Sequence, residues 1–123
     1  MSKEMYDKGM EVRRAVLSDE HVDRAMNSAT NFNQPFQDLV TEYCWGEIWT
    51  RETLSRKTRS LITLAILTSL RADIELKGHV RGALRNGCSE QEIQEVLLHA
   101  TIYCGVPAGM EAFRAAKEVI DAQ

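Results

Sequence analysis

Apolar side chains recur every three or four residues along most of the chain, which is the spacing of helices that bury one face. The alternation typical of β-strands and the short hairpin turns between strands do not occur, and proline is found only at positions 35 and 107. The pattern therefore predicts an all-α fold, a compact bundle of about six to seven helices.

The first part of the chain contains three predicted helices. A helix over about residues 5–17 is followed by Ser18, whose hydroxyl can accept a free backbone N–H and so cap a short second helix. A third helix is expected from Asn33, with Pro35 in its first turn, where the missing N–H costs nothing. Its apolar stripe comprises Phe36, Leu39, Val40 and Tyr43 and leads to Cys44, Trp45 and Trp49.

The fourth predicted helix is capped by Ser55 and contains the run LITLAILTSL at residues 61–70. This run is apolar almost all round, so other helices or another subunit must cover it on every side, and we expect it to be the central element. A chain of this size leaves little spare burial, and oligomerisation is the simplest cover. The alternative, that the neighbouring helices suffice, stays open.

The last part of the chain contains three further helices. Asp73 can cap a fifth helix over residues 74–86, which ends at Gly87, and Ser89 with Glu92 forms a capping box at the start of the sixth. The apolar stripe of the sixth helix comprises Ile93, Val96, Leu97, Ala100 and Cys104. Gly105 and Pro107 then separate it from a last helix over about residues 108–120.

Length and composition fit one globular domain. The 123 residues show no repeat or linker, so we expect a single domain over residues 1–123. Apolar residues make up 44% and charged residues 27%, which is ordinary for a soluble protein. The net charge of −3 and the scattered basic residues argue against nucleic acid as a partner. Arginine outnumbers lysine by ten to five, a weak indication of an anionic ligand, because a guanidinium can bind both oxygens of a carboxylate.

The sequence does not indicate a secretory signal, a membrane-spanning helix or a structural role for its cysteines. The charged opening residues lack the apolar core of a secretory signal, so we expect a cytoplasmic protein. The run at 61–70 is shorter than the roughly 18 apolar residues of a spanning helix, which excludes membrane insertion. Cys44, Cys88 and Cys104 are odd in number and far apart, which argues against a disulfide framework or a structural metal.

Two segments could carry chemistry. His79 follows Glu75 by four residues, so both side chains share one face of the fifth helix and the imidazole can deliver a proton near neutral pH. The segment YCWGEIWTRETLSRKTRS brings together aromatic walls, an acid and guanidiniums, namely Trp45, Glu47, Trp49, Arg51, Arg56 and Arg59. Gly46 gives the backbone freedom, and residues 50–53 should form a loop. Purely structural roles remain open for all of these residues and for Tyr103, which precedes a stiff turn.

The runs WGEIWTR, TRSL, HVRGALRNG and IYCGVPA closely resemble the carboxymuconolactone decarboxylase family, and the resemblance covers nearly the whole chain. It implies the helical fold of alkylhydroperoxidase D-like proteins and a homo-oligomer, a hexamer or a trimer, with the active site close to subunit contacts. Alkylhydroperoxidase D-like enzymes carry a C-x-x-C motif where this chain has Ala72 and Glu75, so thiol redox chemistry is not expected. After the Gly-Val-Pro-Ala run the chain departs from the family pattern at Gly109, Met110 and Arg114, which puts the substrate in question.

The resemblance implies decarboxylation of 4-carboxymuconolactone, a small dicarboxylate lactone, to 3-oxoadipate enol-lactone in protocatechuate breakdown, without a metal or organic cofactor. Our hypothesis makes His79 the proton donor, oriented by Glu75 or Glu47. The substrate-binding candidates are Arg59, Arg51, Trp45, Trp49 and Tyr103, of which the arginines would bind carboxylate or lactone oxygens and the tryptophans would exclude water.

Two other functions remain as alternatives. A non-catalytic helical module for ligand binding or assembly would bind a lactone without releasing carbon dioxide. A thiol-dependent peroxidase partner would require Cys44 and Cys104 to meet in space, which their spacing does not predict.

Overall fold

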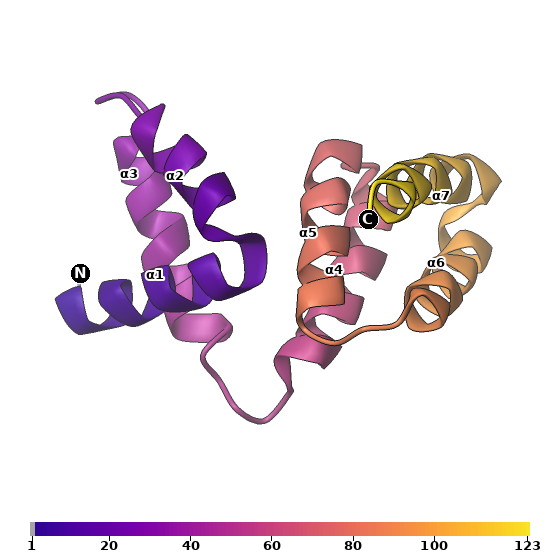
Figure 1. Cartoon of the computed structure of the whole chain (residues 1–123), viewed down its shortest axis with the longest axis horizontal. Helices are drawn as coiled ribbons and strands as arrows, with labels where there is room; N and C mark the ends of the chain where they lie inside the picture. The colour runs from indigo at the N-terminus through magenta and orange to yellow at the C-terminus, as the bar shows by residue number, and fades with distance from the viewer. Residues whose placement is uncertain (1) are drawn as a thin grey trace. The chain divides into compact units, whose positions relative to one another are not determined.

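The computed structural model describes residues 2–123 and shows seven α-helices, one π-helix and no strand over that range (Figure 1). The predicted all-α class is therefore confirmed. The chain divides into two compact units: unit 1 extends to Leu54, and unit 2 spans Ser55–Gln123. The assignment of residues 1–123 to one domain stays a prediction.

Unit 1 consists of α1 (Lys3–Leu17), α2 (Asp19–Asn27), α3 (Gln34–Leu39) and the π-helix η1 (Val40–Ile48). The predicted cap is confirmed, since the backbone N–H of His21 donates to Oγ of Ser18 at 3.1 Å. Asn33 precedes α3 but makes no side-chain bond to that helix; its Oδ1 instead accepts from the backbone N–H of Thr30 at 2.7 Å. The side chain of Asn33 thus closes the turn between α2 and α3.

The π-helix was not predicted from the sequence. In η1 the backbone bonds close five residues apart, as in the 3.0 Å bond from the N–H of Trp49 to the carbonyl of Cys44. The wider coil turns the polar Thr41 inward, where Nη1 of the buried Arg13 donates to its Oγ1 at 3.1 Å. The predicted apolar stripe lines the core only in part: Val40 packs against it, whereas Phe36, Leu39 and Tyr43 are exposed.

Helices α1 and η1 touch backbone to backbone at two glycines. A Cβ atom on Gly9 would overlap the carbonyl oxygen of Thr41, and one on Gly46 would overlap the carbonyl oxygen of Met5. Gly46 is therefore needed for close approach, and our expectation that it supplies backbone freedom was wrong about its role. The contact closes the small core of unit 1, formed by Val12, Val16, Trp45 and Trp49.

Unit 2 consists of α4 (Arg56–Leu70), α5 (Asp73–Arg85), α6 (Glu90–Cys104) and α7 (Val106–Asp121). Helix α4 packs against all three of the others, as we expected of the central element. The four helices share one core, whose buried members include Leu64, Leu76, Val80, Ala83, Ile93, Leu97, Ala112 and Val119. Within residues 2–123 no helix has the length and apolarity to cross a membrane.

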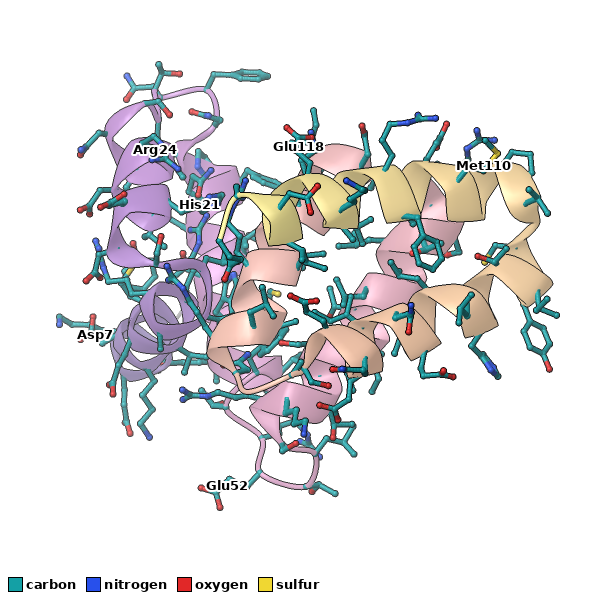
Figure 2. All side chains as sticks on the ribbon, turned by 45° about the vertical axis from the view of Figure 1, so that its right-hand side comes forward. Asp7, His21, Arg24, Glu52, Met110 and Glu118 are labelled. Carbon is teal, nitrogen blue, oxygen red and sulfur yellow. The ribbon has the colours of Figure 1, made fainter. Side chains whose placement is uncertain are left out.

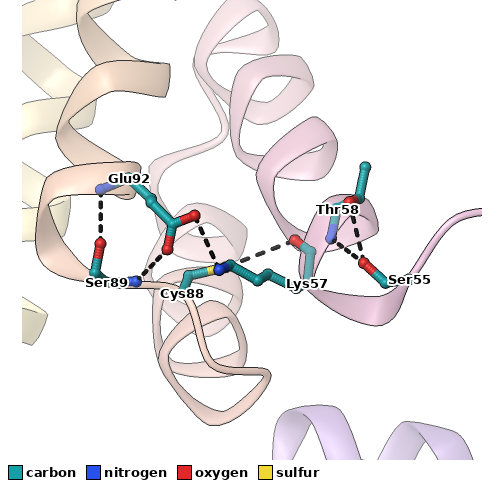
Figure 3. Close-up of polar contacts among 6 residues, drawn as sticks. All are labelled: Ser55, Lys57, Thr58, Cys88, Ser89 and Glu92. Carbon is teal, nitrogen blue, oxygen red and sulfur yellow. Dashed lines mark hydrogen bonds and ion pairs between the residues drawn. The ribbon is translucent and has the colours of Figure 1, made fainter.

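Polar contacts at the helix starts connect α4 to α6 (Figure 3). The backbone N–H of Thr58 donates to Oγ of Ser55 at 3.1 Å, which confirms the predicted cap of α4. Ser89 and Glu92 form the predicted capping box, with bonds of 2.9 and 3.0 Å. Nζ of Lys57 lies 3.0 Å from Oε2 of Glu92, so the same carboxylate caps α6 and pairs with α4.

Two helix boundaries differ from the prediction. Asp73 is the first residue of α5, and the cap position belongs to Ala72, which has no side chain able to cap. The last helix begins at Val106, two residues earlier than expected, because Pro107 fits its first turn. Gly105 ends α6 with a φ of 100°, which a glycine adopts without strain.

Ion pairs join α7 to the α4–α5 corner. The guanidinium of Arg71 lies 2.6 Å from Oε1 of Glu111, and Nζ of Lys77 lies 2.7 Å from Oε2 of Glu118, which Figure 2 labels on the outer side of α7. Each cation holds the pKa of its partner carboxyl below the usual range. Exposed pairs contribute little individually, so the apolar core remains the main source of stability.

The glycine contact predicts a specific sensitivity. Gly46→Ala should lower the free energy of unfolding of unit 1 by about 1–3 kcal/mol, because the added methyl group meets backbone that cannot rotate away. Both tryptophans of the chain lie in unit 1, so urea unfolding followed by tryptophan fluorescence reports on this unit. The matched control is Gly78→Ala on α5, where an added Cβ meets no atom within 4 Å. Equal stability of the two variants would contradict the close contact.

The capping box predicts a pH-dependent contribution to stability. The backbone N–H of Ser89 and then Lys57 lower the pKa of Glu92 from its ordinary value of 4.5. A lowered folded-state pKa contributes stability that is complete above the ordinary value and is lost as pH falls through the folded-state pKa. Glu92→Gln should therefore be less stable than the parent at pH 7, and the gap should close towards pH 3. Urea titrations between pH 7 and pH 3 measure this difference in stability. Glu90→Gln, an exposed change in the same turn, is the control and should differ less from the parent. Equal differences for the two variants would contradict the stabilising role of Glu92.

Candidate active site

The histidine candidate lies on the second turn of α5. His79 is half-buried and stands between the buried Gly78 and Val80, while Glu75, one turn earlier on the same helix, is exposed. Leu76 and Val80 anchor this part of α5 in the core of unit 2, which fixes the backbone beneath the imidazole. The helix therefore holds His79 at the boundary between core and surface, where a group can exchange a proton and still be partly shielded from water.

Arg59 lies on the neighbouring helix. It is half-buried in the first turn of α4, and its carbonyl accepts a 2.8 Å bond from Oγ1 of Thr63. The start of α4 is tied to the end of α5, because Nδ2 of Asn86 donates to Oγ of the buried Ser60 at 2.9 Å. Unit 2 thus carries Arg59, Glu75 and His79 on two packed helices of fixed register.

In the segment 45–51 the aromatic side chains are buried and the charged side chains are exposed. Trp45 and Trp49 are buried in the core of unit 1, with ring centroids 4.8 Å apart. Glu47 is exposed on η1, and Arg51 is exposed in the loop that follows, as predicted for residues 50–53. Glu47 also lines a hollow of about 300 Å³ on unit 1, together with Ser2, Glu4, Met5, Lys8, Gly46 and Thr50. The tryptophans therefore support the helix that presents the acid.

The eight predicted site residues fall into both units. Trp45, Glu47, Trp49 and Arg51 belong to unit 1, and Arg59, Glu75, His79 and Tyr103 belong to unit 2. Tyr103 is exposed at the end of α6, where its ring lies 5.1 Å from that of His99. The functional roles of all eight residues stay predictions.

Sequence reasoning did not single out two buried charges of unit 1. Arg13 donates through Nη2 to Oε1 of Gln37 at 2.9 Å, and burial lowers the pKa of its guanidinium. Glu42 is 2% exposed, and its Oε1 accepts the backbone N–H of Ser2 at 2.7 Å. Arg13 stands in a charged stretch that looks like a solvated helix face, and Glu42 stands within the predicted apolar stripe, so the sequence pattern did not indicate the burial of either side chain.

Two of the three cysteines have thiols of raised pKa. Burial raises the pKa of the Cys44 and Cys88 thiols, which reduces the thiolate available for redox chemistry. Cys44 belongs to unit 1 and Cys104 to unit 2, on η1 and α6. Among residues 2–123 no group of three or more histidine, cysteine or acidic residues is arranged to hold a metal ion.

Comparison with known proteins identifies the family. Residues 34–118, from the start of α3 to the last turn of α7, match the carboxymuconolactone decarboxylase family. The chain belongs to this family. The match spans more than half of the chain and includes all eight predicted site residues. The resemblance stated from the sequence is therefore confirmed.

Three curated relatives give the match more detail. The chain is 43% identical to the nitrosuccinic acid decarboxylase of Metarhizium robertsii over 98% of its own length and 85% of the relative's. It is 41% identical to the 4-carboxymuconolactone decarboxylase of Acinetobacter baylyi, over 95% of this chain and 87% of the relative. A 4-carboxymuconolactone decarboxylase of Pseudomonas putida is 49% identical over 37% of this chain and 94% of the relative. The predicted enzyme class, a carboxy-lyase, is confirmed, whereas the relatives differ in their substrates.

Proposed function

We propose that this chain decarboxylates 4-carboxymuconolactone to 3-oxoadipate enol-lactone in the cytoplasm, as a step of protocatechuate breakdown. The observation that carries the proposal is the 41% identity to the Acinetobacter baylyi enzyme over 95% of the chain. Unit 2 adds a half-buried histidine and a half-buried arginine on packed helices, the residue types that proton delivery and carboxylate binding require.

The substrate can carry the electrons released by decarboxylation without a cofactor. The ring carbon that loses carbon dioxide also bears a carboxymethyl arm and is joined through a C=C bond to the lactone carbonyl. When the C–C bond to the carboxylate breaks, its electron pair is delocalised through the double bond onto the carbonyl oxygen of the lactone, which gives a dienolate. A proton added to the carbon beside the carbonyl then gives the enol-lactone. The protein must hold the retained carboxylate, stabilise the oxyanion and deliver one proton to carbon.

The residues of unit 2 take the central roles in this proposal. His79 delivers the proton to carbon, because an imidazole exchanges protons near neutral pH and this one sits at the edge of the core. Glu75 on the same helix, or Glu47 on η1, orients the imidazole. Arg59 holds a carboxylate or the lactone oxygens in two-pronged geometry.

The remaining candidates support binding. Arg51 provides a second guanidinium for the substrate, and Trp45 and Trp49 exclude water from it. Tyr103 offers a hydroxyl from the end of α6. We further propose that the enzyme works as a homo-oligomer, a hexamer or a trimer, as the exposed apolar side chains of both units favour.

Nitrosuccinate is a second candidate substrate, favoured by the 43% identity to the Metarhizium robertsii enzyme over 98% of the chain. The carbon that loses its carboxylate there bears a nitro group, which accepts the electron pair as a nitronate. Protonation of that carbon gives 3-nitropropanoate, with the second carboxylate retained. Both reactions need one carboxylate clamp, one oxyanion donor and one proton, so the same residues would serve either substrate.

The deciding experiment measures carbon dioxide release from each substrate by the purified protein, with and without a metal chelator. Higher kcat/KM with 4-carboxymuconolactone that survives chelation supports the first proposal, and higher kcat/KM with nitrosuccinate moves the assignment to the second candidate. Binding of the lactone without carbon dioxide release would favour the non-catalytic module.

A variant with serine at all three cysteines should keep full activity, and loss of activity would revive the thiol-dependent alternative.

The proton-donor role predicts a loss of turnover. His79→Ala should lower kcat by about a hundredfold or more, the usual contribution of a general acid, without unfolding the protein. Steady-state kinetics with circular dichroism checks both parts, and His21→Ala on α2 is the matched histidine control. Near-normal turnover in His79→Ala would remove the residue from the mechanism.

The carboxylate clamp predicts a change in binding. Arg59→Lys should raise KM by about tenfold while kcat changes less, because lysine keeps the charge and loses the second hydrogen bond. Arg56→Lys, an exposed change one turn earlier on α4, should leave both constants near the parent values. Identical kinetics of the two variants would exclude Arg59 from the site.

A further inference from the structure

The buried carboxylate of Glu42 lies against the start of α1. The side chain is 2% exposed, and its Oε1 accepts the backbone N–H of Ser2 at 2.7 Å. The other oxygen, Oε2, is buried as well and accepts no hydrogen bond from any residue of the range 2–123. Half of this carboxylate is therefore removed from water without a donor in exchange, which is costly for a charged group.

The position of Glu42 is fixed by the backbone contact between α1 and η1. A Cβ atom on Gly9 would overlap the carbonyl oxygen of Thr41, which directly precedes Glu42. One turn later, a Cβ atom on Gly46 would overlap the carbonyl oxygen of Met5. Because the two backbones touch on both sides of Glu42, η1 cannot slide along α1 to bring another donor to Oε2.

The lysines nearest to Ser2 along α1 pair with acids of their own helix. Nζ of Lys3 lies 2.8 Å from Oδ2 of Asp7, and Nζ of Lys8 lies 3.3 Å from Oε1 of Glu4. A buried carboxylate needs a counter-charge as well as hydrogen bonds. The group placed to supply both is the nitrogen that already touches the carboxylate, the backbone nitrogen of Ser2.

We propose that the peptide bond between Met1 and Ser2 is hydrolysed and that the freed α-ammonium of Ser2 is the counter-ion of Glu42. Hydrolysis consumes one water molecule, releases methionine and leaves an amine. The amine takes up a proton at neutral pH, because an α-amino group titrates at about pH 8. The dipeptide Met-Ser suits the aminopeptidases that remove methionine ahead of a small residue.

An ammonium at Ser2 fits the carboxylate better than an amide does. The amide has a single N–H, which Oε1 already accepts, whereas an ammonium has three and can also donate to Oε2. The 2.7 Å separation lies in the range of charge-assisted hydrogen bonds. A positive charge at the start of a helix is unfavourable by itself, since the helix dipole is positive there, and the buried carboxylate offsets both. The pair thus ties the start of α1 to η1.

The first test is the intact mass of the full chain, produced in a bacterial host without a tag ahead of Met1. The protein should be lighter than its sequence by one methionine residue and should carry no acetyl group, because acetylation removes the charge of the amine. Retention of Met1 or acetylation of Ser2 overturns the proposal.

The second test separates the ammonium from the helix cap, since Oγ of Ser2 also accepts the backbone N–H of Met5 at 3.2 Å. Ser2→Thr keeps a capping side chain that is small enough for methionine removal, and Ser2→Asn keeps a capping side chain that is too large for it. Capping alone makes asparagine at least as good as threonine. The ion pair predicts the reverse: Ser2→Asn should have an unfolding equilibrium constant about tenfold or more above that of Ser2→Thr.

Urea unfolding followed by tryptophan fluorescence measures this difference, because both tryptophans lie in the core of unit 1. The intact mass of each variant establishes whether its start is an amide or a free amine. A Ser2→Asn variant that retains Met1 and is as stable as Ser2→Thr, or more stable, overturns the proposal.

The third test asks whether Glu42 recognises the charge. Glu42→Gln is made in the Ser2→Thr and Ser2→Asn backgrounds and should raise the unfolding constant about tenfold more in the first, where it leaves an ammonium without its counter-ion. Glu11→Gln, an exposed change on α1, should have the same small effect in both backgrounds. An equal effect of Glu42→Gln in both backgrounds overturns the proposal. Where Glu42→Gln does not fold, the comparison of the two Ser2 variants decides by itself.

This inference goes beyond the proposed reaction and does not rest on it. Mass and unfolding report on the ion pair whether or not the protein releases carbon dioxide. An intact pair without turnover contradicts only the decarboxylase assignment, and turnover by a chain that retains Met1 contradicts only the ion pair.

Discussion

The structure depends most on the packing of α4. This helix contributes Leu64 to the core of unit 2, contacts the other three helices of that unit, and carries Arg59 in its first turn. Its start is held by the Ser55 cap, the Lys57–Glu92 pair and the bond between Ser60 and Asn86. Burial of apolar area supplies the free energy and the polar contacts fix the register, so the position of Arg59 relative to α5 follows from core packing.

The two units differ in where their charged residues lie relative to the core. In unit 2 the shared core consists of apolar residues, and His79 stands at its edge beside Val80. In unit 1 two charged residues, Arg13 and Glu42, are themselves buried. Such groups are tolerated only with hydrogen-bond partners, and Gln37, Thr41 and the backbone of Ser2 provide them. Unit 1 thus combines a small apolar core with buried charged residues, and both support the helix that presents Glu47.

Helix caps and apolar spacing predicted most of the helices of unit 2 and less of the structure of unit 1. Caps at Ser18, Ser55 and Ser89 were confirmed because each depends on one side chain and the nearby backbone. The π-helix was missed because its register is set by the backbone contact with α1, which no residue pattern within η1 announces. The candidate site could be predicted only as residue types. Sequence spacing placed Glu75 and His79 on one helix, whereas the position of Tyr103 depends on how α6 packs.

The glycine contact of unit 1 also sets an order of events during synthesis. Gly9 leaves the ribosome well before Gly46, and α1 gains its main packing partner only when η1 is complete. The guanidinium of Arg13 likewise gains its partners only when Gln37 and Thr41 arrive. The first helix therefore lacks most of its cover, and Arg13 lacks its partners, until a segment some thirty residues behind it has been made. The opening of the chain is thereby the part most exposed to chaperones and proteases while the rest is being made.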